Sequence, residues 1–348
     1  MSKRLEYIDA MRGFTMCMVV FQHIALFNGG GILSPSGEVL RDIFISFRMP
    51  LFFFISGFIA YKSSEFWTSS SYRQRIATKA RVQLLPTVFF YMLYALCFGT
   101  NPLQFFEKGF QIYWFTFVLF EIFLIYFTCS FLLRKHSHVL DIVLILLAIT
   151  FVLMQKLSFT YSHYGQVMSM LNLSSYLQFF VLGHFANKYS TQAFKLIRNN
   201  YINALVILFF VAAMIAMTKF GLFADNLVAE WALKYELLRY AGLFIVLSFF
   251  YKHRNYFEAG GRVSRAMQYI GRRTLDIYML HYFFVLYSKN PSLPLVQAIT
   301  SSDSIVVQIA GLGVMTLLIV GLCLLVSEVL RNSNLLAYCL FGAKRVRE

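Results

Sequence analysis

Residues 8–27 read IDAMRGFTMCMVVFQHIALF, an almost unbroken apolar run that also holds an arginine and a histidine. A helix that crosses a membrane needs about 20 mostly apolar residues. The run is longer than the apolar core of a signal peptide, and no convincing small-residue cleavage site ends it. We therefore interpret it as a retained membrane helix. Other apolar runs of similar length in the chain are candidates for further membrane helices.

The composition of the whole chain indicates a membrane protein. Of its 348 residues, 59% are hydrophobic, 18% aromatic and only 14% charged. A soluble domain carries roughly a quarter of its residues as charged ones, so these charges are too few to cover a soluble globule. The 39 Phe and 21 Tyr exclude a disordered chain. The net charge of +15 does not indicate nucleic-acid binding, because the basic residues lie between apolar runs and form no soluble basic face.

The apolar runs predict about ten membrane spans and an all-α polytopic bundle. These lie at residues 8–27, 43–61, 82–99, 112–133, 139–155, 173–187, 201–218, 235–251, 273–289 and 305–330. The longest polar stretches, residues 62–81 and 252–272, are interpreted as basic cytoplasmic loops. No linker divides the chain, so we expect residues 1–348 to form a single integral-membrane domain.

The distribution of basic residues supports this alternation of spans. With a cytoplasmic N-terminus, 23 of the 31 Lys and Arg fall on the cytoplasmic side, as the positive-inside rule requires. Both termini are then predicted to be cytoplasmic. Five widely separated cysteines show no spacing typical of a disulfide framework or a metal site, and we predict no metal.

The first span carries two polar residues on one face. Arg12 and His23 are separated by eleven residues, close to a whole number of helical turns, which is about 16 Å along the axis. Arg12 is expected near the cytoplasmic end and His23 well across the membrane. A histidine at that depth can be neutral and can serve as a general base.

Two arginines are predicted at a similar depth to His23, in the outer half of the bundle. Arg48 lies about five residues into the second span, and Arg239 enters with the eighth. Ionisable residues inside spans cost a few kcal/mol and are candidates for function. The alternative is that Arg239 extends to lipid headgroups, with Glu236 as a local partner.

Deeper polar residues lie in the fourth and ninth spans. Glu121 has Trp114 two turns before it on the same face, and His281 shares a face with Tyr278. A carboxylate near the middle of a membrane needs a partner or a proton. Each of these residues could equally make a structural hydrogen bond between helices.

A basic segment precedes the third span. Residues 72–81, YRQRIATKAR, hold Arg73, Arg75, Lys79 and Arg81. One interpretation is a topology signal that also attracts anionic lipids. The other is a clamp for the phosphates of a polyphosphate ligand.

Six stretches in order make the chain resemble the acyltransferase 3 family of multi-span bacterial membrane acyltransferases. The first is the Arg12-x10-His23 pair, and the third is Lys79-x-Arg81 before LLP at 84–86, where the family usually has arginine twice. The others are FRMPLFFFISGF (47–58), YWFTFVLF (113–120), FFVLGHFANKY (179–189) and GRRTLDIYMLH (271–281). Asp276 departs from the family, which more often has Ser or Tyr there.

The resemblance implies transfer of an acyl group, acetyl by default, from cytoplasmic acyl-CoA to a hydroxyl group. The acceptor would be an extracytoplasmic carbohydrate or a lipid-linked glycan precursor, and the location the bacterial cytoplasmic (inner) membrane. His23 would be the catalytic histidine, Arg12 its close supporter, and Lys79 and Arg81 part of the donor-side basic motif.

Both lines of reasoning combine into one hypothesis. Arg73, Arg75, Lys79 and Arg81 hold the CoA nucleotide, and His23 is the base or the acyl carrier, with Arg48 in the catalytic group. The substrate-binding residues are Arg239, Glu121, His281, Trp114 and Tyr278. The expected partners are acyl-CoA, the glycan acceptor and membrane lipids, without nucleic acid. The alternative is a proton-coupled transporter or flippase of an anionic solute or glycolipid.

Overall fold

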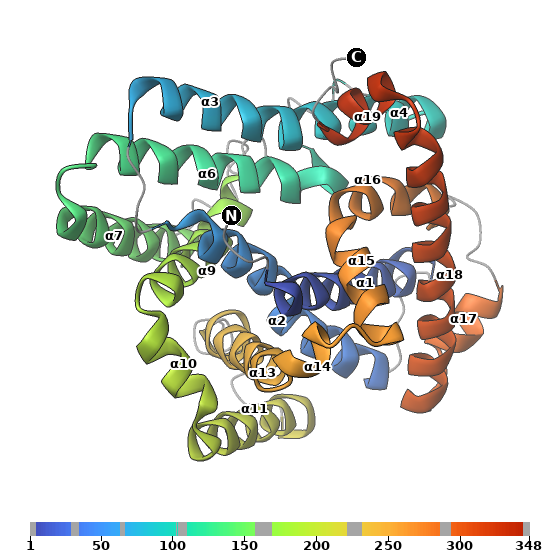
Figure 1. Cartoon of the computed structure of the whole chain (residues 1–348). Coiled ribbons are helices and arrows are strands. Elements are labelled where there is room, and N and C mark those ends of the chain that lie inside the picture. The colour runs from blue at the N-terminus through green and yellow to red at the C-terminus, as the bar shows by residue number, and fades with distance from the viewer. Residues whose placement is uncertain are drawn as a thin grey trace. The chain divides into compact units, whose positions relative to one another are not determined.

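The structure is a computed structural model that describes residues 5–28, 35–62, 67–101, 103, 110–156, 169–220, 232–285 and 294–343. Figure 1 shows that the regular structure of these residues is helical, without strands. The helices divide into two compact units. One comprises residues 1–52 and 189–327, and the other residues 53–188 and 328–348.

The first unit is built around the N-terminal helix. It contains α1 (Glu6–Asn28), the first part of α2 (Pro35–Ala60), α10 (Ser190–Arg198), α11 (Asn200–Phe220), the π-helix η5 (Ala232–Leu237), α13 (Leu238–Lys252), α14 (Arg254–Glu258), α15 (Arg262–Arg272), α16 (Thr274–Phe284), α17 (Pro294–Thr300) and most of α18 (Ile305–Arg331).

Two glycines let α1 and α15 pack backbone against backbone. A Cβ atom added to Gly13 would lie 2.0 Å from the carbonyl oxygen of Met267. One added to Gly271 would lie 1.8 Å from the carbonyl oxygen of Asp9. Small residues at such crossings are typical of membrane helices, where close packing replaces the hydrophobic effect between helices. The glycine of the GRRTLDIYMLH stretch is therefore a packing residue.

The second unit holds the remaining helices. It contains the end of α2, α3 (Ser69–Lys79), the π-helix η1 (Ala80–Leu84), α4 (Leu85–Phe98), the 3-10 turn η3 (Gln111–Tyr113), α6 (Trp114–Leu132), α7 (Ser137–Lys156), α9 (Met170–Lys188) and α19 (Asn334–Phe341). In Figure 1, α3 lies alongside α6, and α7 alongside α9.

The second unit uses the same glycine contact. A Cβ atom on Gly57 of α2 would lie 1.9 Å from the carbonyl oxygen of Phe180, and one on Gly183 of α9 would lie 2.0 Å from that of Phe54. These glycines belong to the FRMPLFFFISGF and FFVLGHFANKY stretches. Both units thus contain a helix pair whose close packing depends on glycine.

Seven of the ten predicted spans fall on helices that are long and apolar enough to cross a membrane. These are Glu6–Phe27, Gly37–Ala60, Ser69–Phe98, Trp114–Leu132, Ser137–Gln155, Asn200–Thr218 and Ile305–Arg331. The other three, at 173–187, 235–251 and 273–289, fall on α9, on η5 with α13, and on α16, which do not meet both conditions. Residues 286–289 lie outside the described residues. The count of ten and the cytoplasmic termini stay predictions.

Several of the long helices carry apolar side chains on their exposed faces. Leu205 on α11 is 68% exposed, and Leu317 on α18 is 63% exposed. Many exposed apolar side chains are unfavourable in water and natural in lipid. The exposed apolar faces agree with an integral membrane protein.

The two segments predicted as loops are largely helical, so that part of the prediction is wrong. Residues 69–79 form α3, which continues into α4 through the π-turn η1 just before Pro86, a residue unable to donate a helical hydrogen bond. Residues 262–272 form α15, whose Ser264, Gln268 and Ile270 are buried. The many charged residues made both segments resemble loops in the sequence. Residues 63–66 lie outside the described part.

The contact between α1 and α15 predicts the effect of adding one methyl group. Gly13→Ala would force the two backbones apart, and overpacking of this kind costs about 3 kcal/mol or more. We expect a clearly lower melting temperature for the purified protein in detergent, measured by a thermal shift.

The control is Gly321→Ala in α18, where nothing lies within 4 Å of the added Cβ. Alanine favours a helix over glycine by roughly 0.5–1 kcal/mol, so this variant should melt no lower than the unmodified protein. Equal melting of Gly13→Ala and Gly321→Ala would contradict the close packing.

Candidate functional site

His23 and His281 are hydrogen-bonded to each other inside the first unit. Nδ1 of His23 on α1 lies 2.8 Å from Nε2 of His281 on α16. The other nitrogen of His281, Nδ1, lies 3.0 Å from the backbone carbonyl oxygen of Ile277, one turn earlier in the same helix. His281 has no exposed surface. Two residues 258 positions apart in the sequence thus form one polar pair.

Aromatic rings enclose this pair. The ring of Tyr282 lies 4.0 Å from that of His281 and 5.1 Å from that of His23, measured between centroids. Phe27 lies 5.5 Å from His23, and Tyr278 lies 5.9 Å from His281. Tyr278 was predicted from its position on the His281 face, but Tyr282 was not. The only sequence signal for Tyr282 is its place next to His281.

Arg48 and Arg239 lie on helices that cross closely in the same unit. Arg48 is near enough to His23 for its charge to act on the ring. A Cβ atom on Gly242 of α13 would lie 2.4 Å from Oγ of Ser46 on α2, and both arginines are within one turn of that crossing. Arg239 is 5% exposed, so it is enclosed by protein and does not extend to lipid headgroups.

Arg12 is half-buried on α1, on the His23 face as predicted. The eleven-residue separation corresponds to about 16 Å along the helix, which is too far for a hydrogen bond between the two side chains. Arg12 therefore lies along the same helix face without touching the histidine pair.

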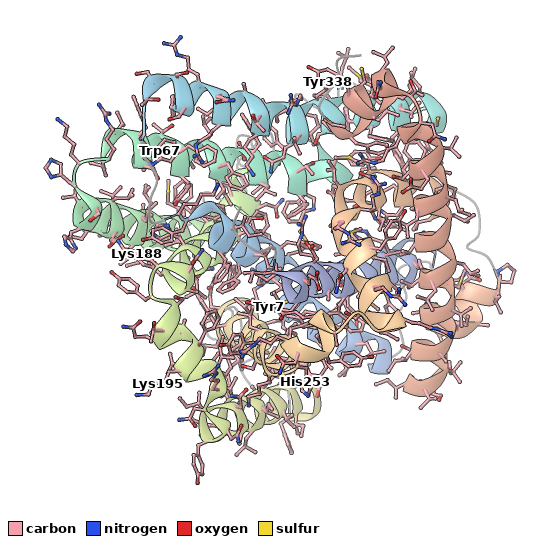
Figure 2. The ribbon with its side chains drawn as sticks, viewed as in Figure 1. Tyr7, Trp67, Lys188, Lys195, His253 and Tyr338 are labelled. Carbon is pink, nitrogen blue, oxygen red and sulfur yellow. The ribbon has the colours of Figure 1, made fainter. Side chains whose placement is uncertain are left out.

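The basic segment lies in the second unit, along α3 and η1, and three of its cations lie over aromatic rings. The guanidinium of Arg75 lies 5.0 Å from the centroid of Trp67, and Nζ of Lys79 lies 3.4 Å from that of Phe123. Arg81 lies 5.9 Å from Tyr338 of α19. Figure 2 shows Trp67 and Tyr338 well apart along this row of helices. Lys79 is therefore directed toward α6 and Arg81 toward α19.

The fourth basic residue, Arg73, is exposed. A cation–π contact contributes about 0.5–2 kcal/mol and limits the motion of the cationic group. Arg75, Lys79 and Arg81 are thus ordered by neighbouring rings, whereas Arg73 extends from the surface.

Trp114 and Glu121 also lie in the second unit, both on α6. Trp114 stacks on Tyr176 of α9, with ring centroids 5.4 Å apart. Glu121 is half-buried, and one of its carboxylate oxygens is buried without a hydrogen-bond partner among the described residues. Trp114 and Glu121 were predicted from the sequence as substrate-binding residues together with residues of the first unit.

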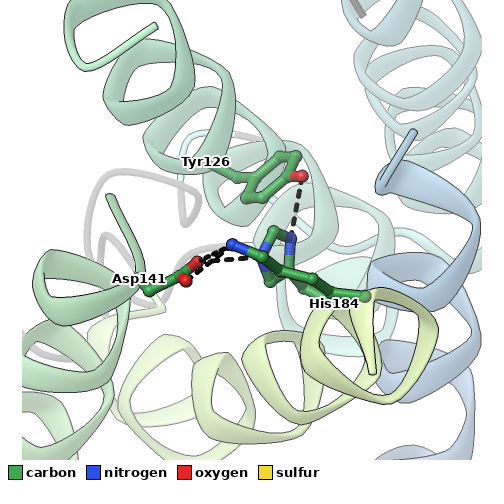
Figure 3. A network of polar contacts seen from close by, with 4 residues as sticks. Tyr126, Asp141 and His184 are labelled. Carbon is green, nitrogen blue, oxygen red and sulfur yellow. Dashed lines mark hydrogen bonds and ion pairs between the residues drawn. The ribbon is translucent and has the colours of Figure 1, made fainter. Parts of the chain in front are cut away.

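A buried polar network in the second unit was not foreseen (Figure 3). Nζ of Lys188 lies 2.8 and 2.6 Å from the two carboxylate oxygens of Asp141. Nε2 of His184 lies 3.7 Å from Asp141, and its Nδ1 lies 3.0 Å from the hydroxyl of Tyr126. The network joins α6, α7 and α9. Spacing along one helix does not reveal partners on two others, so the sequence gives no signal for this network.

Asp276, where the chain departs from the family pattern, has a structural role in the first unit. It is buried and accepts a hydrogen bond from the hydroxyl of Ser327 on α18. Its carboxylate also lies 3.8 Å from Arg273. Asp276 points away from the face that carries His281.

No cluster of three or more potential metal ligands occurs among the residues that the structure describes. The features above define an integral membrane protein whose described residues form helices, with a hydrogen-bonded pair made by the buried His281 and the half-buried His23. A family model described as an acyltransferase domain matches residues 5–328. The chain belongs to the acyltransferase 3 family and is an acyltransferase by that membership. Comparison with curated proteins and with solved structures gave no match.

The Asp141 network predicts a measurable coupling. Asp141→Asn would leave the Lys188 ammonium without its counter-ion, and breaking a buried pair costs roughly 3–5 kcal/mol, less where the lysine can reach water. We expect a lower melting temperature for this variant in detergent.

The matched comparison is Asp141→Leu combined with Lys188→Met, which removes both charges. The double variant should be more stable than Asp141→Asn, because no uncompensated charge remains. If the stability losses of Asp141→Leu and Lys188→Met alone add up to that of the double variant, the ion pair does not contribute to stability.

Proposed function

We propose that the protein transfers an acyl group, most simply acetyl, from acyl-CoA to a hydroxyl of an extracytoplasmic carbohydrate or lipid-linked glycan precursor. The observation that carries the proposal is the hydrogen-bonded His23–His281 pair, with His281 buried and His23 half-buried, in a chain of this family. One nitrogen of His23 is engaged by His281, and its other nitrogen is the group offered to substrate. An imidazole so placed is suited to general-base catalysis.

The reaction then balances without a further reactant. His23 takes the proton of the acceptor hydroxyl, and the acceptor oxygen attacks the thioester carbonyl. The new C–O bond forms as the C–S bond breaks, and the CoA sulfur leaves with the proton that His23 had taken. In the variant with an acyl carrier, His23 itself attacks the thioester and passes the acyl group to the hydroxyl.

We propose that Arg48 and Arg239 of the first unit stabilise the oxyanion of the reaction or hold the acceptor. Arg48 lies on α2 in the same unit as His23, and its guanidinium is the group we assign to the negative charge that develops on the carbonyl oxygen. Arg239, Tyr278 and His281 are the proposed substrate contacts of this unit. Within the second unit, Trp114 and Glu121 are the proposed substrate contacts. An aromatic ring such as Trp114 is a common platform for a sugar ring.

We assign the CoA nucleotide to Arg73, Arg75, Lys79 and Arg81. The nucleotide carries several phosphate charges, and Arg and Lys are the side chains that recognise phosphate. Arg75, Lys79 and Arg81 are already ordered by Trp67, Phe123 and Tyr338, which reduces the entropy lost on binding. The proposed location is the bacterial cytoplasmic membrane, with the basic segment on the cytoplasmic side and no metal or nucleic acid involved.

Loss of the His23 imidazole should strongly slow acyl transfer. His23→Ala is expected to lower kcat by about 100- to 10,000-fold, the usual contribution of a general base. The measurement is transfer or hydrolysis of labelled acetyl-CoA by the purified protein, with folding checked by its melting temperature.

The control is His253→Ala, which removes an exposed histidine elsewhere in the first unit (Figure 2) and should keep normal activity. A folded His23→Ala protein with normal transfer would contradict the assignment. Movement of an anionic solute without consumption of acyl-CoA would favour the transporter.

The basic segment should control the affinity for the donor. Lys79→Gln and Arg81→Gln are each expected to raise the KM for acetyl-CoA about tenfold, the effect of losing one charge-assisted hydrogen bond to phosphate. Lys195→Gln removes the same charge at an exposed position of α10 and should change KM little. Equal effects of all three variants would indicate general attraction to the membrane surface instead.

A further inference from the structure

The geometry of the histidine pair is that of a hydrogen bond in the plane of both rings. The ring planes differ by only 10°, and the centroids lie 5.1 Å apart. With nitrogens 2.8 Å apart, the rings cannot be stacked face to face, because parallel rings in van der Waals contact lie farther apart than that. Nδ1 of His23 and Nε2 of His281 therefore point at each other.

The backbone of α16 fixes which nitrogen carries the proton. Ile277 offers a carbonyl oxygen, which can only accept, so Nδ1 of His281 must donate the 3.0 Å bond. In a neutral imidazole the other nitrogen then has no proton. Nε2 of His281 is therefore an acceptor, and the bond from His23 is donated by Nδ1.

The same reasoning identifies Nε2 of His23 as the basic nitrogen. When Nδ1 of His23 carries the proton, Nε2 of that neutral ring has a lone pair and can act as a base. A histidine's tautomer is set by the hydrogen bond of its other nitrogen. A chain of two hydrogen bonds thus runs from the Ile277 carbonyl through His281 to His23.

We propose that His281 is a positioning residue that holds His23 in the tautomer whose Nε2 is the base for acyl transfer. This inference rests on the proposed function, and it changes the role of His281 from substrate contact to orientation of the catalytic ring. When Nε2 of His23 takes the proton from the acceptor hydroxyl, Nδ1 keeps its own proton. That proton remains hydrogen-bonded to His281, which stabilises the imidazolium.

The enclosure by aromatic rings supports this role. Tyr282 packs against both imidazoles, and His281 is fully buried. Because His281 is fully buried against Tyr282, the ring that accepts the bond from His23 is held in place before substrate binds. Catalytic groups held in advance lose less free energy to reorganisation during the reaction.

The first experiment reads the tautomer directly. Nitrogen-15 NMR of histidine-labelled protein in detergent distinguishes a protonated Nδ1 from a protonated Nε2, and His23→Gln identifies the His23 signals by their loss. We expect His23 to carry its proton on Nδ1 in the unmodified protein. In His281→Leu this preference should be lost. A His23 ring protonated on Nε2 in the unmodified protein would overturn the proposal.

The second experiment compares two substitutions of similar size at His281. His281→Gln keeps an oxygen that can accept the bond from His23, whereas His281→Leu does not. We expect His281→Leu to lower kcat by about 100-fold or more, with the KM for acetyl-CoA within about threefold, and His281→Gln to recover most of that loss. Equal losses in both variants would indicate a purely structural role and overturn the proposal.

The two measurements separate this inference from the proposed function. The tautomer of the unmodified protein is read without any substrate, and the only variant that reading needs is His23→Gln, which assigns the His23 signals. A protein with His23 protonated on Nδ1 but without acyl transfer would contradict the proposed function alone. A protein with normal acyl transfer and the opposite tautomer would contradict the role of His281 alone.

Discussion

The direct contact between the backbones of α1 and α15 is the constraint on which the first unit depends. Gly13 meets the Met267 carbonyl and Gly271 meets the Asp9 carbonyl, so neither helix can slide or rotate without a collision. Only Arg273 separates the end of α15 from the start of α16. His23 follows Gly13 by ten residues in the chain, and His281 follows Gly271 by the same number. The packing of two glycines thus determines where two distant imidazoles meet.

The histidine pair gains its chemistry from this rigidity. An imidazole buried in a bundle is useful as a base only if one particular nitrogen carries the lone pair, and that depends on a partner held at hydrogen-bond distance. Here the partner's own proton is fixed by a backbone carbonyl, which can only accept a hydrogen bond. In the second unit, two kinds of contact converge on α9. Gly57 and Gly183 allow α2 to pack closely against it, and Asp141 of α7 binds its Lys188.

Much of the fold could be predicted from the sequence, because membrane helices are selected for length and apolarity, and both are local properties. The spacing of Arg12 and His23 likewise predicted that they share a helix face, because α1 is one continuous helix that carries both residues. The pairing of His23 with His281 could not be predicted, because two separate helices place the rings. The helices within 62–81 and 252–272 were hidden by charge, although Ser264, Gln268 and Ile270 are buried. The family resemblance identified important stretches such as GRRTLDIYMLH, but not that its first residue packs and its last pairs with His23.

The π-turn at Ala80–Leu84 makes the basic segment depend on residue count as well as residue identity. It adds a residue to the turn between α3 and α4, with Lys79 directed to Phe123 and Arg81 to Tyr338. Deleting one residue there would allow a regular helix, and every residue of α3 would turn by roughly 100° relative to α4. Arg75 and Lys79 would then leave their rings although neither had been replaced. Two chains with the same basic-x-basic letters can therefore differ in where those cations point, according to whether the turn beside them is π or α.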